Sequence, residues 1–299
     1  MKVVFHFDGS PALAQQVARL GVELCPESDV VAFERLLSEM EVLWHVLKPV
    51  TAQVIERAPR LKLIQKIGSG VNTIDVEAAK RRGIAVCNLP GTNSRAVAEM
   101  ALLLMLACLR RLPQLHAHAT GGTWSEAWAL QDRFAELGGR TVGLVGYGAV
   151  AKMLHPMLEA LDARVIYWSR SQATAEFTKV LAESDIVSLH LPLTPETDKL
   201  IDPRRMKRGA ILVNTARGGL VDPVLLLETL QYGHLAAAGL DVFVQEPPGA
   251  NDPLLALENV VCAPHLAWLT QETLERSIAA AWRNVQRLRS GEPLENRVA

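Results

Sequence analysis

Short apolar runs alternate along the chain with stretches in which apolar residues recur at the spacing of a helix. The most complete example spans residues 141–170. Its apolar runs at 141–145 and 164–168 predict parallel strands, because a strand covered on both faces reads as continuous apolar sequence. Leucines at helical intervals lie between the two runs and predict a helix that begins near Ala149. The segment is therefore expected to fold as strand, turn, helix and strand.

The alternation continues on both sides of this unit. Before it, we expect strands at 2–7, 42–46, 61–67 and 84–86, and helices at 10–20, 51–58 and 75–82. After it, we expect strands at 185–191, 210–214, 236–240 and 260–262, a helix at 222–232 and a long C-terminal helix from Thr270. Strands that alternate with helices predict the α/β class, here with two doubly wound parallel-sheet domains.

One stretch between the two sets of strands interrupts the alternation. A helix is expected from the candidate N-caps at 92–94 to just before Pro113. It is apolar on nearly all sides, so we expect it to be buried. Residues 114–137 show no clear period, and we interpret them as an irregular surface connection. An oligomer contact through Trp124 and Trp128 is the alternative.

The turn of the central unit contains glycine where a dinucleotide would approach the backbone. Gly146 permits the tight turn after the strand, and Gly148 leaves room for a pyrophosphate. The helix that follows points its free N–H groups and its positive dipole end at that phosphate. A glycine turn that binds nothing is the alternative, but the complete unit favours a dinucleotide site.

The second strand of this unit ends without the acidic residue that commonly binds a ribose 2′-hydroxyl. Ser169 and Arg170 stand there instead, and a hydroxyl beside a guanidinium suits a 2′-phosphate. We therefore expect NADP as the favoured cofactor, with NAD as the alternative.

Composition narrows the class of protein. Of the 299 residues, 49% are hydrophobic and 21% are charged, as in a globular chain with room for two domains. The net charge of −1 gives no attraction to nucleic acid or to an anionic membrane. The four cysteines, Cys25, Cys87, Cys108 and Cys262, lack metal-ligand spacing and are expected to be reduced core or strand residues. Because no signal-peptide pattern begins the sequence, we expect a cytoplasmic protein.

A glycine-rich loop at residues 68–72 follows a predicted strand, at the end where parallel sheets bind ligands. Its N–H groups suit a nest for a carboxylate, and Lys66 adds positive charge just before it. A plain strand-to-helix turn explains the same residues equally well.

Three residues with acid–base or charge chemistry lie past the ends of predicted parallel strands: Arg217, Glu246 and His265. Those strand ends share one edge of a doubly wound sheet, so residues distant in sequence converge there. Each has an ordinary explanation by itself, as a solvent-facing arginine, a loop carboxylate or a hydrogen-bonded histidine. Together, beside a dinucleotide site, they fit a site that moves a proton and a hydride.

Seven long segments, in order along nearly the whole chain, resemble one known family: APRLKLIQKIGSGVNTID, AAKRRGIAVCNLPGTNSRAVAEMAL, LGGRTVGLVGYGAVA, LHLPLTPET, ILVNTARGGLVD, AAGLDVFVQEPP and ENVVCAPHLAWLT. The chain is similar to the D-isomer-specific 2-hydroxyacid dehydrogenases of the glyoxylate and hydroxypyruvate reductase type. This resemblance implies a Rossmann dinucleotide-binding domain at 95–270, inserted into a smaller flavodoxin-like substrate-binding domain at 1–94 and 271–299. The substrate would lie in the cleft between the two domains.

The resemblance also implies roles for single residues. Arg217 would bind the substrate carboxylate and keto oxygen, His265 would donate the proton during reduction, and Glu246 would pair with His265. The substrate-binding residues would be Lys66, Ser69, Gly70, Val71 and Trp268. The cofactor-binding residues would be Gly146, Gly148, Ala149, Val150, Ser169, Arg170, Leu191, Pro192, Thr197, Thr215, Ala216, Arg217, Asp241 and His265. No metal is required.

The sequence departs from the common family pattern at four places. Asn72 replaces an Asp and Ala151 replaces a Gly, and neither change disturbs the expected site. Ser169 replaces the acidic residue and therefore bears on the cofactor. Trp268 stands where many members have a small residue, so the shape of the substrate pocket is expected to differ.

The activity implied is the NAD(P)H-dependent reduction of a small 2-keto acid to the D-2-hydroxy acid. Two alternatives stay open: oxidation of the D-3-phosphoglycerate type, and a cofactor-sensing binding protein on the same fold. The expected partners are the small acid and a second copy of the chain in a homodimer, with no nucleic acid and no membrane.

Overall fold

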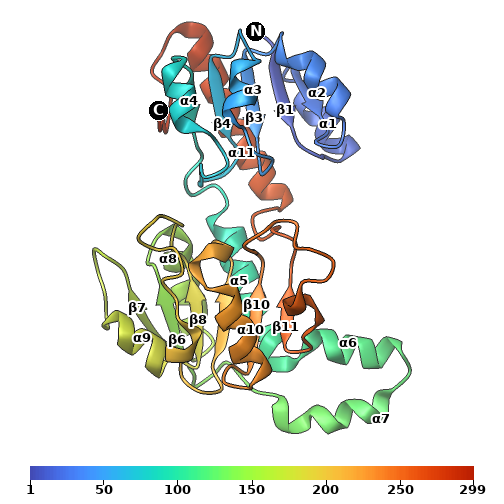
Figure 1. Cartoon of the computed structure of the whole chain (residues 1–299), viewed down its shortest axis with the longest axis vertical. Helices are drawn as coiled ribbons and strands as arrows, with labels where there is room; N and C mark the ends of the chain where they lie inside the picture. The colour runs from blue at the N-terminus through green and yellow to red at the C-terminus, as the bar shows by residue number, and fades with distance from the viewer. The chain divides into compact units, whose positions relative to one another are not determined.

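The computed structural model describes all 299 residues. The chain divides into two compact units, one formed by residues 1–93 and 269–299 and the other by residues 94–268. Figure 1 shows that each unit has its own sheet with helices against it. Both sheets are entirely parallel, so the prediction of two doubly wound α/β domains is confirmed.

The first unit contains five strands in the spatial order β2 (Val22–Cys25), β1 (Val3–His6), β3 (Val42–His45), β4 (Leu63–Lys66) and β5 (Ala85–Cys87). This is the flavodoxin-like order, in which the chain leaves β1 on one side and continues from β3 on the other. The sequence pattern missed β2 and the helix that follows it. β2 is an edge strand, and its apolar run is interrupted by the polar Glu23, so the pattern did not predict a strand. Glu23 forms an ion pair with Lys2, the residue before β1.

Five helices pack in the first unit: α1 (Pro11–Ala18), α2 (Val30–Leu37), α3 (Ala52–Glu56), α4 (Val76–Arg81) and α11 (Gln271–Ser290). Each begins after a side chain that accepts a hydrogen bond from the first helical turn: Ser10, Asp29, Thr51, Asp75 and Thr270. Such caps satisfy N–H groups that have no partner inside the helix. The predicted starts of α3, α4 and α11 are confirmed.

A buried amide holds the C-terminal helix to the N-terminal sheet. The side chain of Asn284 on α11 is fully buried, and its Nδ2 donates to Gln65 Oε1 on β4 at 2.7 Å. Its Oδ1 accepts from the Glu295 N–H at 2.8 Å. An amide buried at this depth requires such partners, so α11 is fixed to a strand 219 positions earlier in the chain.

The second unit contains six strands in the order β11 (Val260–Cys262), β10 (Ala237–Leu240), β9 (Ile211–Asn214), β8 (Ile186–Leu189), β6 (Thr141–Val145) and β7 (Arg164–Trp168). The chain runs outward from β6 to the edge strand β7 and then returns to β8 on the other side of β6. The order of strands therefore reverses at β6, and ligands of such sheets bind at this point, beyond the carboxyl ends of the strands.

Helices cover both faces of this sheet. One core joins α5 (Ser94–Arg110) and α8 (Ala149–Glu159) to side chains such as Leu144 and Val213. The other joins α9 (Phe177–Glu183) and α10 (Pro223–Gln231) to side chains such as Leu212. Leu212 and Val213 point to opposite faces because successive residues of a strand alternate. Three short 3₁₀ helices lie in the loops between later strands: η2 (Pro203–Arg205), η3 (Gly218–Leu220) and η4 (Pro253–Ala256).

The segment at 114–137 lies at the surface, as predicted, but the prediction that it is irregular is wrong. The segment forms α6 (Leu112–Thr120), α7 (Trp124–Ala127) and the 3₁₀ helix η1 (Trp128–Arg133), which extend away from the sheet of the second unit (Figure 1). None of these three helices contains a buried residue. A helix without a core-facing side carries no apolar period, so the pattern gave no signal. The helix α9 was also missed.

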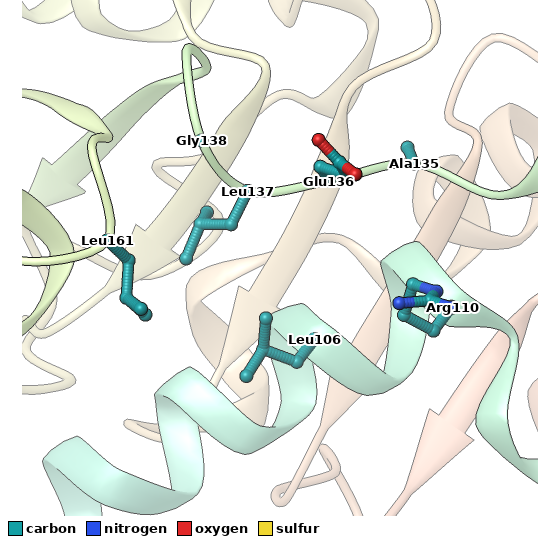
Figure 2. A pocket seen from close by; sticks show the side chains of 7 residues that line it. All are labelled: Leu106, Arg110, Ala135, Glu136, Leu137, Gly138 and Leu161. Atoms are coloured by element: carbon teal, nitrogen blue, oxygen red, sulfur yellow. The ribbon is translucent and has the colours of Figure 1, made fainter.

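The expectation that α5 is buried is only partly correct. Leu103 and Leu106 remain 51% and 37% exposed. Leu106 lines a shallow hollow of about 240 Å³, where it lies with Leu137 and Leu161 (Figure 2). The cysteines are core or strand residues, as predicted: Cys25, Cys87 and Cys108 are buried, and Cys262 is exposed at the end of the edge strand β11. No helix is long and apolar enough to cross a membrane.

Candidate functional site

Three strand ends of the second unit lie in one row. Asn214 of β9 pairs with Leu240 of β10, which in turn pairs with Cys262 of β11. Each strand ends at this row, so the three loops that follow start side by side at the carboxyl edge of the sheet. These loops carry Arg217, Glu246 and His265 respectively.

The loop after β9 is shaped by the side chain of Asn214, which is 2% exposed. Its Oδ1 accepts from the Ala216 N–H at 3.0 Å, and its Nδ2 donates to the Arg217 carbonyl at 2.9 Å. The next residue, Gly218, touches the neighbouring loop so closely that a Cβ there would lie 2.1 Å from the carbonyl carbon of Phe243. A side chain at 218 would therefore separate the loop of Arg217 from the loop of Glu246.

Glu246 and His265 form a direct hydrogen bond. Glu246 Oε2 lies 2.6 Å from His265 Nδ1, and Glu246 Oε1 accepts from the Phe243 N–H at 2.9 Å. Burial opposes ionisation of the carboxyl, but the hydrogen bonds from His265 and Phe243 outweigh it, and the charge of Arg217 adds to them. The pKa of Glu246 is therefore lowered, and the group is a carboxylate at neutral pH.

Arg217 shares the electrostatic environment of this pair. Burial lowers the pKa of Arg217, and the negative charge of Glu246 opposes that shift. Its Nη1 donates to the Ala216 carbonyl at 2.6 Å, while the rest of the guanidinium retains its other donors. The structure thus brings the three residues selected from the sequence to one edge of the sheet.

Asp241 has a structural task that the sequence did not reveal. Its buried carboxylate accepts from the N–H groups of Leu266 and Ala267 at 2.9 and 3.0 Å, and its carbonyl accepts from the His265 N–H at 2.8 Å. Burial raises its pKa, although both N–H bonds act against the rise. His265 has a φ of 55°, a conformation uncommon for a residue with a side chain. Asp241 therefore holds the turn that orients His265.

The glycine turn after β6 fits a dinucleotide phosphate. Gly146 has a φ of 94°, and a Cβ there would lie 2.6 Å from the His190 carbonyl oxygen. At Gly148 a Cβ would meet nothing within 4 Å, so open space adjoins the backbone. No side chain caps α8, and the first N–H groups of the helix, at Ala149 and Val150, face that space without a protein acceptor.

The remaining residues predicted to contact the cofactor lie around the same edge. Leu191 packs against Gly146, within 3.1 Å of where its Cβ would be. Thr197 donates to the Pro192 carbonyl at 2.7 Å and so fixes the loop after β8. Thr215 Oγ1 is buried without a hydrogen-bond partner in the protein. A buried hydroxyl without a partner is costly, so a bound ligand that satisfies it would stabilise the site.

Ser169 and Arg170 form a tight turn at the end of β7. Ser169 Oγ donates to the Gln172 carbonyl at 2.6 Å and accepts from the Gln172 N–H at 3.1 Å. Its only proton is therefore engaged within the turn, contrary to the expectation that it is available to a ligand. Arg170 is exposed at the turn, and its charge helps to lower the pKa of Glu196.

The glycine-rich loop lies in the first unit. Gly68 has a φ of 139°, which requires glycine, and its carbonyl accepts from the Leu89 N–H at 2.8 Å. The Ser69 carbonyl accepts from Asn88 Nδ2 at 2.7 Å. Lys66 is only 5% exposed, and its ammonium donates to the Val46 carbonyl and to Thr73 Oγ1. In the second unit, Trp268 is 7% exposed.

Comparison with known proteins adds independent evidence. The family model of the D-isomer specific 2-hydroxyacid dehydrogenase NAD binding domain matches residues 102–267. The chain is 38% identical over 281 residues to a glyoxylate reductase of Korarchaeum cryptofilum, covering 89% of this chain and 85% of that protein. It is also 38% identical over 262 residues to a D-3-phosphoglycerate dehydrogenase of Archaeoglobus fulgidus, covering 83% of this chain but only 49% of that protein.

A solved structure agrees with these matches. The NAD-dependent formate dehydrogenase of Staphylococcus aureus in complex with NAD superimposes with a TM-score of 0.88 at 26% identity, covering 100% of this chain and 99% of that one. The family match spans more than half of the chain, and the match to the glyoxylate reductase spans 89% of it. The chain therefore belongs to the D-isomer specific 2-hydroxyacid dehydrogenase family and is an NAD-dependent oxidoreductase.

Proposed function

We propose that this enzyme reduces a small 2-keto acid of the glyoxylate or hydroxypyruvate type to the D-2-hydroxy acid with NAD(P)H. The observation that carries the proposal is the 2.6 Å contact between His265 Nδ1 and Glu246 Oε2 on the sheet edge that also carries Arg217. The glyoxylate reductase of Korarchaeum cryptofilum, which this chain covers over most of its length, supports the substrate class.

The nicotinamide, when bound, supplies the hydride to the carbonyl carbon. Arg217 offers a guanidinium to the carboxylate and keto oxygen of the acid, which fixes the carbonyl and favours negative charge on its oxygen. His265 gives that oxygen a proton from Nε2, because Nδ1 is held by Glu246. The carboxylate of Glu246 pairs with Nδ1 and fixes the orientation of the ring, and Asp241 holds the backbone of the turn that carries His265.

The two domains predicted from the sequence take different parts in this proposal. Residues 95–270 serve as the dinucleotide-binding domain, with the phosphates at Gly146, Gly148, Ala149 and Val150. Residues 1–94 and 271–299 serve as the substrate-binding domain, in which the N–H groups of Gly70 and Val71 and the hydroxyl of Ser69 take the substrate carboxylate. Trp268 limits the size of the acid.

Oxidation of phosphoglycerate is less well supported. The chain spans about half the length of the D-3-phosphoglycerate dehydrogenase that it matches. Lys66, the residue placed to meet a phosphate, is buried and already donates to Val46 and Thr73. An ammonium held in this way has few donors left for a phosphate group.

We further propose that NADPH is the preferred cofactor. The strand end that commonly carries an acid carries Ser169, and the turn closed by this serine presents the exposed Arg170. Arg170 suits a 2′-phosphate, and no carboxylate at position 169 repels one.

We also propose a homodimer formed through α6, α7 and η1. Trp124 and Trp128 are 72% and 73% exposed on this segment, which has no buried residue of its own. Two large aromatic side chains left in water on one short segment are typical of an interaction surface.

Replacement of His265 tests the catalytic proposal. His265→Gln removes the proton donor, so kcat for glyoxylate or hydroxypyruvate reduction should fall by roughly 100-fold or more while the Kd for the reduced cofactor stays unchanged. His234→Gln is the matched control: His234 bonds the Met206 carbonyl and precedes the amino end of β10, at the opposite edge of the sheet from the site, so this variant should keep full activity. Near-normal turnover of His265→Gln would remove His265 from the role.

The cofactor proposal is tested by kcat/KM for one keto acid with NADPH and with NADH. Wild type should prefer NADPH by about 10-fold, equivalent to about 1.4 kcal/mol. Ser169→Asp keeps an acceptor for the Gln172 N–H but adds a negative charge, and should abolish or reverse the preference. Arg170→Ala should weaken NADPH binding alone. A wild-type enzyme that prefers NADH would refute the proposal.

Light scattering tests the dimer. The wild-type chain of 32.7 kDa should elute with twice that mass. The double variant Trp124→Glu, Trp128→Glu places two charges on the exposed segment and should shift the mass to that of a monomer without a change in circular dichroism. A monomeric wild type, or a variant that remains a dimer, would show that this segment is not the interface.

A further inference from the structure

Three polar side chains of the first unit meet at the carboxyl end of its sheet. His45 ends β3 and Lys66 ends β4, and the two are 1% and 5% exposed. His45 Nε2 lies 3.0 Å from Thr73 Oγ1 and 3.4 Å from Lys66 Nζ, and Lys66 Nζ lies 3.3 Å from Thr73 Oγ1. The three side chains therefore form a closed triangle, which we call the loop clasp.

The loop clasp joins the two ends of the glycine-rich loop. Lys66 stands just before residues 68–72 and Thr73 stands just after them. Backbone hydrogen bonds hold the same two ends of the loop: the Val50 N–H donates to the Thr73 carbonyl at 2.8 Å, and the Ile67 N–H donates to the His45 carbonyl at 2.9 Å. Both stems of the loop are thus tied to β3 and the residues that follow it.

The hydrogen bonds of the clasp are consistent only if the imidazole is neutral. Burial, then the charge of Lys66 and then that of His6 lower the pKa of His45 to about 2. The neutral ring leaves Nε2 as an acceptor for the Thr73 hydroxyl, whose oxygen in turn accepts from the Lys66 ammonium. Lys66 also donates to the Val46 carbonyl. The Thr73 hydroxyl is therefore both donor and acceptor, and no apolar side chain can replace it.

The Gly68 and Ser69 carbonyls are held by the Leu89 N–H and by Asn88 Nδ2, but the N–H groups at the tip of the loop are not held in this way. The N–H groups of Gly70 and Val71 donate to no acceptor in the protein, and Ser69 is exposed. Inside the loop and its stem, the Ile74 N–H donates to the Val71 carbonyl at 2.9 Å. Two adjacent N–H groups without acceptors bind an anion only while the backbone keeps them convergent. The conformation of the tip consequently depends on how firmly its ends are held.

We propose that the loop clasp of His45, Lys66 and Thr73 fixes the glycine-rich loop in the conformation that binds the substrate carboxylate. Thr73 is then a positioning residue, which acts on the substrate through the N–H groups of Gly70 and Val71. This inference rests on the proposed function, in which those N–H groups take the carboxylate. His45 and Lys66 are buried, and the three side chains of the clasp are occupied by one another.

Thr73→Val tests the clasp with the smallest change of shape, and Thr73→Ser restores the hydroxyl. KM for the keto acid should rise about 5- to 10-fold in Thr73→Val with kcat within twofold of wild type, because a carboxylate contact made equally in ground and transition states affects KM alone. Thr73→Ser should return KM to within twofold. Thr51→Val is the matched control: it removes a helix-capping hydroxyl in the same unit and should lower Tm without changing KM.

Hydrogen exchange separates this inference from the proposed function. The amides of Val50 and Ile74 are hydrogen-bonded to the Thr73 and Val71 carbonyls at the stem of the loop. They should exchange faster in Thr73→Val than in wild type and Thr73→Ser, with no substrate present and with β3 and β4 unchanged. Faster exchange with wild-type KM would show that the loop does not bind the carboxylate, and unchanged exchange would overturn the clasp. A wild-type enzyme inactive on 2-keto acids would refute the proposed function but leave the exchange result as evidence for the clasp.

Discussion

The parallel pairing of β9, β10 and β11 is the constraint on which the chemistry of the second unit depends. It ends three strands in one row, at Asn214, Leu240 and Cys262. Three loops that are separated by tens of residues in the chain therefore leave the sheet side by side. Without that common row, the 2.6 Å contact between the loops of β10 and β11 would have no structural basis.

Buried polar side chains at the row then set the shape of each loop. Asn214 forms two hydrogen bonds with the backbone of the loop that carries Arg217. Asp241 accepts three hydrogen bonds from the turn that carries His265, two at its carboxylate and one at its carbonyl oxygen. Gly218 lets two of these loops touch. A polar group buried in an apolar sheet is costly without partners, so each of these residues specifies one loop conformation. The loop clasp applies the same principle in the first unit.

The sequence predicted the parts of the site that depend on strand ends and glycines. Arg217, Glu246 and His265 follow apolar runs that predict strands. The glycines after β6 are spaced as a dinucleotide site requires, one for the tight turn and one for close approach of a phosphate. The task of Asp241 was missed because its partners, Leu266 and Ala267, are reached only once β10 and β11 pair. The turn closed by Ser169 depends on local hydrogen bonds that no apolar pattern encodes. The helices of the exposed segment α6 to η1 were missed because they have no core-facing side and therefore no apolar period.

The central claim is that the shared row couples Glu246 to His265, and a double-mutant cycle tests it most directly. Glu246→Gln keeps an acceptor for the Phe243 N–H but removes the carboxylate charge that faces His265 Nδ1. We predict that kcat for reduction of a keto acid falls by roughly 10-fold or more in Glu246→Gln. Because the two residues act as a unit, the double variant Glu246→Gln, His265→Gln should be no slower than His265→Gln alone. Losses that multiply in the double variant would show that the two residues act independently and would contradict the claim.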